Sequence, residues 1–168
     1  MGEAEERPQL IGGVVLKVIY SCYWGSYLAV VAASLHLGLL KGNDDLSNEK
    51  ILNLPFFGKI KKGDLGEMTF IGTDNRGREI YVMGSKKSGR IIERTLNGFA
   101  QIYGLEKHTV DFIDLMKYNN FYTCCGTFMI HKLGLKNAGM AVLIWGIKKS
   151  FGRLRNLVSK VLNEPAYF

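Results

Sequence analysis

The sequence has little cysteine and little proline, and these shortages exclude several classes of protein. Three cysteines in 168 residues, two of them adjacent, are too few and too badly spaced for a disulfide framework. Three prolines, and 20 glycines without a repeating period, exclude collagen-like and proline-rich chains. Because 47% of the residues are hydrophobic, the chain can bury a core, and its length is that of one domain.

Residues 1–8 are acidic on balance, with three glutamates and one arginine, so the N-terminus lacks the basic n-region of a secretory signal. We expect residues 1–13 to form an acidic, flexible segment and residues 14–168 to form a single domain. Residues 18–40 contain no charged side chain and are long enough to be a membrane-span candidate. The run is interrupted by serine, glycine and histidine, and a buried strand, a turn and a buried helix explain it equally well. We therefore expect a soluble, cytoplasmic protein without a membrane span, whose unpaired thiols suit a reducing compartment.

Acidic residues are missing from the stretch 117–163, although the whole chain carries a net charge of only +7. This asymmetry predicts a basic surface for phosphate, nucleic acid or anionic lipid. A solvated face that happens to be basic is the alternative. The stretch holds eight basic residues: Lys117, Lys132, Lys136, Lys148, Lys149, Arg153, Arg155 and Lys160.

Hydrophobic periodicity and glycine punctuation predict alternating strands and helices. This order favours a three-layer α/β/α domain, Rossmann-like, with a mostly parallel central sheet and one hairpin around 72–77. The expected strands are 14–20, 68–71, 79–83 and 110–115, and the expected helices are 26–37, 47–53, 90–103, 121–133 and one within 141–162.

The first candidate site is the turn after the first strand, where Cys22, Tyr23, Gly25 and Ser26 precede a helix. Ligands of open α/β sheets bind beyond the carboxyl ends of strands, and a helix N-terminus there attracts anions. A thiolate nucleophile would gain from the same dipole. Leu28 stands where a tyrosine-phosphatase loop needs arginine, and no Walker loop is present. The alternative is that Cys22 is simply a small buried side chain.

The second candidate site is the glycine-bounded loop 84–89, which also lies between a strand and a helix. Glycines allow close approach of backbone N–H groups to a phosphate, and Ser85, Lys86, Lys87 and Arg90 add hydroxyl and cationic groups. Ser88 fits equally well as the N-cap of the next helix. If the two preceding strands are parallel, both loops lie at one edge of the sheet and form one site.

The C-terminal helix is the third candidate, because its basic residues share the arc opposite an apolar one. Lys149, Arg153 and Lys160 represent this basic arc, which could bind a polyanion or a protein partner. A helix that covers the sheet and solvates its outer face is the alternative. We expect no metal site, since no cysteine or histidine pair has zinc spacing. Whether the protein uses a cofactor is left open by the residues.

Several blocks of sequence resemble a family of small proteins from endospore-forming, clostridia-like bacteria, whose domain has no known function. The resemblance rests on residues 18–23, 32–38, 54–57, 70–84, 133–135 and 144–149. It implies a cytoplasmic protein, with a link to sporulation. The first turn departs from the family pattern His-Cys-Tyr-Gly-Gly-Thr-His-Ser-Ser at Ser21 and Tyr27, where the family has histidine.

Two functional hypotheses follow from the residues. The first is binding of a phosphate-bearing small molecule or nucleotide at loops 22–27 and 84–90. The second is a non-enzymatic interaction protein that uses the basic C-terminal helix to contact a protein, a nucleic acid or an anionic membrane surface. The residues do not indicate whether the protein is an enzyme.

Overall fold

The computed structural model describes residues 16–41, 46–60, 62–104 and 110–163, which form a mixed α/β fold with a four-stranded open sheet and five α-helices. The predicted boundary between residues 13 and 14 lies outside the described residues and stays a prediction. The strands are β1 (Lys17–Cys22), β2 (Met68–Thr73), β3 (Glu79–Gly84) and β4 (Val110–Asp114). The helices are α1 (Leu28–His36), α2 (Asn48–Leu52), α3 (Gly89–Ile102), α4 (Phe121–His131) and α5 (Lys136–Asn163), with short 3-10 turns at Lys62–Asp64 and Met116–Tyr118.

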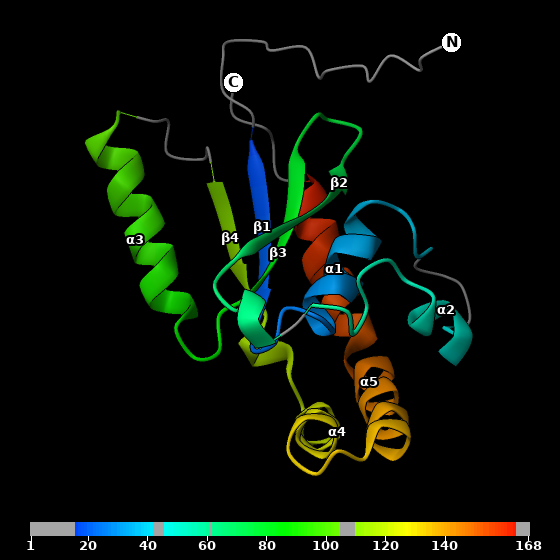
Figure 1. Ribbon diagram of the computed structural model, residues 1–168. Helices are drawn as coiled ribbons and strands as arrows, with labels where there is room; N and C mark the ends of the chain where they lie inside the picture. Colours follow the sequence, from blue (N-terminus) through cyan, green and yellow to red (C-terminus); the bar gives the residue numbers. More distant parts are fainter. Residues whose placement is uncertain (1–15, 42–45, 61, 105–109, 164–168) are drawn as a thin grey trace, which may run out of the picture.

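The sheet has the order β2-β3-β1-β4 (Figure 1). Strand β1 pairs in parallel with both β3 and β4, and β2 pairs antiparallel with β3. The predicted hairpin is therefore confirmed, and so is the α/β class. The more specific prediction of a mostly parallel, Rossmann-like three-layer domain is not confirmed, because the antiparallel β2 makes the sheet mixed.

One face of the sheet carries the main core. Side chains alternate along a strand, so Val18, Tyr20 and Cys22 share this face of β1, and all three are buried. Helix α1 is buried along its whole length and packs here together with the apolar side of α5 (Figure 1). The uncharged run that resembled a membrane span is thus a strand and a helix. Within the described residues, no helix combines the length and the apolar character needed to cross a bilayer.

The opposite face carries Ile19, Tyr81 and Phe112, which the strand register places side by side. Helix α3 lies on this face and contacts β4, as its first residue shows: a Cβ added at Gly89 would meet Asp114 Oδ2 at 2.6 Å. In Figure 1, α3 stands on the side of the sheet away from α1 and α5.

A buried polar cluster fastens the hairpin to α1. The hydroxyl of Tyr20 and Nδ1 of His36 are 2.7 Å apart, and Nε2 of His36 lies 3.0 Å from Asp74 Oδ2. Arg78 donates from Nε to Asp74 at 2.7 Å and from Nη1 to the carbonyl of Val161 on α5 at 3.1 Å. The cluster therefore joins β1, α1, the hairpin turn and the end of α5.

Candidate functional site

Parallel pairing brings the two predicted loops to the same edge of the sheet, as the sequence led us to expect. The N–H of Ser85 donates to the Cys22 carbonyl at 3.0 Å, and the N–H of Lys86 donates to the Tyr23 carbonyl at 3.1 Å. The hydroxyl of Ser21 donates to that of Ser85 at 2.7 Å. The end of β1 and the loop after β3 are thus locked together by direct hydrogen bonds.

Gly25 and Ser26 hold the segments at this edge of the sheet together. Gly25 has φ +73°, and a Cβ there would lie 2.6 Å from the nitrogen of Gly84, so only glycine allows the two turns to meet. The hydroxyl of Ser26 donates to the carbonyl of Ile60 at 3.0 Å. Ser26 was also a candidate N-cap, but α1 begins one residue later, with Tyr27 at the N-cap position and no side-chain cap.

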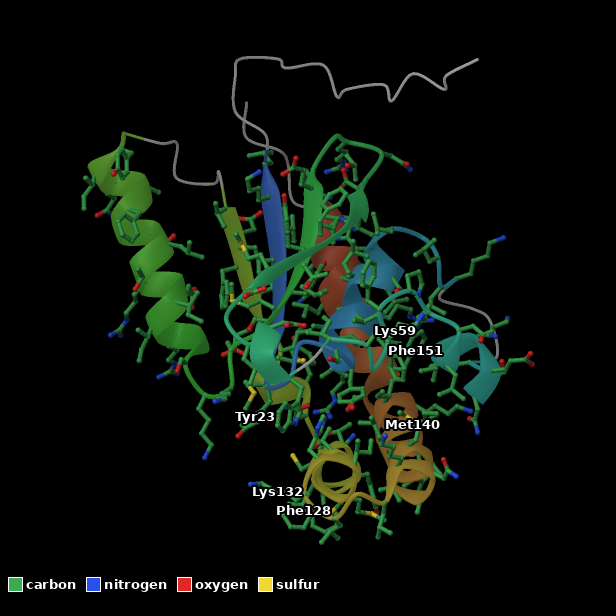
Figure 2. The ribbon with its side chains drawn as sticks, in the orientation of Figure 1. Tyr23, Lys59, Phe128, Lys132, Met140 and Phe151 are labelled. Carbon is green, nitrogen blue, oxygen red and sulfur yellow. The ribbon has the colours of Figure 1, made fainter. Side chains whose placement is uncertain are left out.

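A cavity of about 300 Å³ opens beyond the carboxyl ends of β1 and β4. The turns described above form one wall, and α4 forms the other, with Leu143 and Ile147 of α5 behind it. In Figure 2, Tyr23 lies at the end of the sheet above α4, while Phe128 and Lys132 extend from α4 below it. The lining residues are Cys22, Tyr23, Trp24, Tyr27, Leu28, Lys87, Met116, Asn119, Thr123, Cys124, Thr127, Phe128, His131, Lys132, Leu143 and Ile147.

His131 joins the two walls of the cavity. Its ring stacks on Trp24 with centroids 4.0 Å apart and planes inclined by 19°. Its Nε2 lies 3.1 Å from the hydroxyl of Tyr27. Burial raises the pKa of Tyr27, so this hydroxyl stays neutral near pH 7 and hydrogen-bonds as a phenol. Because His131 comes from α4 and its two partners come from the β1–α1 turn, these contacts fix the width of the cavity.

The Cys22 thiol is not an activated nucleophile in this structure. It is 4% exposed, and burial raises its pKa above the ordinary value. Hydrogen bonds from backbone N–H groups of the turn lower the pKa of the thiol, but by less than burial raises it. One of these groups is the N–H of Gly25, which donates to the sulfur at 3.2 Å. The N–H groups that we expected to face an anion are therefore directed at the thiol, and the alternative of a small buried side chain describes Cys22 better.

The structure divides the predicted binding residues into three groups. Cys22, Tyr23 and Lys87 line the cavity. Gly25, Ser26 and Ser85 are buried behind it and hold the two turns together. Lys86 and Arg90 are exposed and do not line it.

The basic residues predicted on the C-terminal helix are exposed, as expected. Lys149, Arg153 and Lys160 all face solvent, while Ile147, Leu154 and Val158 on the opposite arc are buried. Lys149 has a more specific environment than its neighbours. Its ammonium lies 4.1 Å from the ring centroid of Trp145 and 4.6 Å from that of Tyr122 on α4.

The side of the cavity formed by α4 was not predicted as part of a site. A signal was present in the spacing, because Thr123, Thr127 and His131 recur every four residues and share one helix face. Cys124, Phe128 and Lys132 follow the same interval on the adjacent face. Nothing in the sequence indicated that these faces would meet the end of β1. Among the described residues, no cluster of three or more histidine, cysteine or carboxylate side chains could hold a metal ion.

Comparison with known proteins gives a family and no activity. Residues 17–163 match the model of a family described as "Protein of unknown function (DUF3189)". No curated protein matches the chain. No solved structure matches it either.

Proposed function

The chain belongs to the DUF3189 family of unknown function, and we propose, from its site alone, that it binds a small phosphate-bearing molecule with a flat apolar body, such as a mononucleotide, in the cavity between the β1–α1 turn and α4. The observation that carries this proposal is one cavity, beyond the carboxyl ends of parallel strands, that is lined by aromatic side chains and two lysines. We place this activity in the reducing cytoplasm, which the free cysteines favour.

The walls supply the apolar part of the binding energy. Tyr23, Trp24 and Phe128 offer aromatic surface, on which a base or another planar group can pack. The volume of about 300 Å³ lies at the small end of ligand sites, which span about 300–1,000 Å³, and this favours a mononucleotide-sized ligand over a dinucleotide.

The anionic group would be held by Lys87 and Lys132, which reach the cavity from opposite walls. Lys87 belongs to the loop between β3 and α3, and Lys132 follows the last residue of α4. Both side chains are exposed, so their ammonium groups are accessible to a phosphate. The N–H groups around Cys22 take no part, because they point at its sulfur.

Ligand-induced stabilisation tests this proposal, because a molecule that binds only the folded state raises its melting temperature. The probes are inorganic phosphate, pyrophosphate, nucleoside monophosphates and nucleoside triphosphates. We expect at least one monophosphate to raise the Tm, and the double variant Lys87→Ala, Lys132→Ala to lose most of this shift. Lys59→Ala is the matched control, because Lys59 is exposed and does not line the cavity. No shift with any probe, or an equal shift in the double variant, contradicts the proposal.

A second candidate function is contact with a polyanion through the exposed side of α5. The feature that favours it is the lack of any acidic residue from 117 to 163 together with Lys149, Arg153 and Lys160 exposed on one helix. Trp145, 47% exposed beside Lys149, adds an aromatic surface of the kind that nucleic-acid-binding sites combine with basic groups.

Salt dependence tests this second candidate, since each neutralised phosphate releases counterions. We expect single-stranded RNA to bind at low salt and to be released as salt rises. The triple charge reversal of Lys149, Arg153 and Lys160 to Glu should abolish binding. The control replaces the exposed Lys41, Lys50 and Lys59 by Glu, which changes the net charge by the same amount and should preserve RNA binding. Equal loss in both variants would show that only net charge matters and would refute the candidate.

A further inference from the structure

The apolar side of α3 is wider than its contact with the sheet requires. At 100° per residue, the side chains of Ile91, Ile92, Leu96, Phe99 and Ile102 span an arc of about 140°, roughly two fifths of the helix circumference. An amphipathic surface helix needs a stripe of about 100° to cover a core. Helix α3 therefore carries more apolar surface than a single packing contact uses.

Only one part of this apolar side is covered. Ile92, Leu96 and Ala100 are half-buried, and they lie on the arc that continues from Gly89, where the helix touches Asp114. Ile91 and Ile102, on the remaining arc, are 68% and 78% exposed. Phe99 and Tyr103, stacked on each other, are exposed as well.

The sheet beneath α3 is also incompletely covered. Parallel strands are normally buried on both faces, because helices pack on each. Here every residue of β4 is only half-buried, and Phe70 on β2 is 49% exposed beside the ring of Tyr81. Met68, two residues before Phe70, is similarly exposed. Strand β2 lies at one edge of the sheet, and α3 packs on β4 at the other edge. Apolar side chains on both elements are thus left in contact with water.

The charges on this face indicate a neutral, apolar occupant. Helix α3 carries only Arg90, Glu93 and Arg94, which are of mixed sign. On the strands, Lys17 is paired with Glu79. A polyanion or an anionic membrane surface would select a face of one positive sign, and that sign is found on α5 instead.

We propose that this face joins two copies of the chain in a symmetric dimer, through α3 and the exposed edge of β2. Five large apolar side chains are exposed on these two elements, and Tyr103 directly follows α3; at roughly 100 Å² each, these six side chains would bury about 600 Å² per chain. Stable interfaces bury about 800 Å² per partner, so two such faces approach the size required. A two-fold axis places the same patch on both partners, and a neutral apolar patch is complementary to itself. This inference is independent of the ligand proposed above.

Sedimentation velocity and light scattering of the full-length chain test the dimer. We expect the wild-type protein to sediment as a dimer at micromolar concentration, and Phe99→Glu and Ile102→Glu to yield monomers with an unchanged circular dichroism spectrum. Both side chains are exposed, so the monomer should tolerate the substitutions. Phe121→Glu and Leu133→Glu are matched controls at the start of α4 and just after its end, exposed by 74% and 56%, and should remain dimeric.

Three outcomes overturn the proposal. A wild-type monomer at every concentration would exclude the second copy as the occupant. Dimers that persist in Phe99→Glu and Ile102→Glu, or that dissociate in the Phe121→Glu control, would place the interface on another face. A monomer that binds vesicles of neutral or anionic phospholipid and loses this binding in Phe99→Glu would identify a lipid surface as the occupant.

Discussion

Replacing Gly126 by alanine should destabilise the protein although alanine is the better helix former. Gly126 lies in the middle of α4, and an added Cβ would be 2.6 Å from the nitrogen and 2.7 Å from the Cα of Leu143 on α5. Ordinary contact is roughly 3.5 Å, so the two helix backbones would have to separate by about 0.9 Å. Because the obstructing atoms belong to the backbone, no rotamer change can relieve the overlap.

The net effect is the difference between two opposing contributions. Overpacking costs about 1–3 kcal/mol, and an overlap with backbone atoms favours the upper end. Helix propensity returns about 1 kcal/mol. We expect Gly126→Ala to lower the free energy of unfolding by about 2 kcal/mol, and the Tm by roughly 4–8 °C for a chain of this size.

Gly152→Ala is the matched control, because Gly152 is an exposed position of α5 with no atom within 4 Å of an added Cβ. This variant should gain about 0.5–1 kcal/mol. Urea unfolding of both variants, followed by circular dichroism, gives the comparison. If Gly126→Ala is as stable as Gly152→Ala, then α4 and α5 are not in backbone contact, and the α4 wall of the cavity is misplaced.

The remaining predictions concern the buried polar cluster and the cysteines. Burial lowers the pKa of His36, so its imidazole binds a proton less readily in the folded state than in the unfolded state. The contribution of His36 to the free energy of unfolding should therefore be fully present above about pH 6.5 and should be lost as the pH falls toward the lowered pKa. His36→Gln should flatten this dependence in urea titrations between pH 5 and pH 7, and an unchanged slope would assign it elsewhere. For Asp74, burial alone would raise the pKa, but hydrogen bonds from His36 and Arg78 outweigh it and lower the pKa, which adds a further loss of stability at lower pH. Arg78→Met removes the guanidinium that pairs with the buried Asp74 carboxylate and should cost about 3–5 kcal/mol of unfolding free energy; a loss below about 1 kcal/mol would show that the pair is solvated. A maleimide reagent should label Cys124 in the native protein well before Cys22, because Cys124 is exposed and the pKa of the buried Cys22 thiol is raised; mass spectrometry that finds Cys22 labelled first would contradict this order.

The local elements were predictable because their signals are local. Ser47 accepts a hydrogen bond from the N–H of Lys50 and caps α2. Gly38, Gly104 and Gly134 follow the ends of α1, α3 and α4 with positive φ, as the sequence suggested. The turn between 72 and 77 joined two short apolar runs, and those runs pair as a hairpin.

The candidate site could be predicted only in part. The sequence indicated both strand-to-helix turns, but whether they meet depended on β1 and β3 running in parallel. Cys22 was predicted in the turn after the first strand, whereas the structure makes it the last residue of β1, where burial raises the pKa of its thiol. Lys87 lines the cavity and its neighbour Lys86 does not. This difference depends on the direction of the backbone within one loop, which the composition of the loop does not encode.

The sequence by itself determined the elements, their amphipathic faces and the concentration of positive charge on α5, because helix caps, hydrophobic periods and charge counts act over a few neighbouring residues. The tertiary structure alone decided that α4 would close the cavity, since that wall depends on Gly126 meeting α5 and on His131 reaching Trp24, more than 100 positions away in the chain. The tertiary structure also decided that a large part of the apolar side of α3 stays exposed. An apolar stripe shows that a helix face must be buried, but the identity of the surface that buries it is a property of packing between distant segments or between molecules.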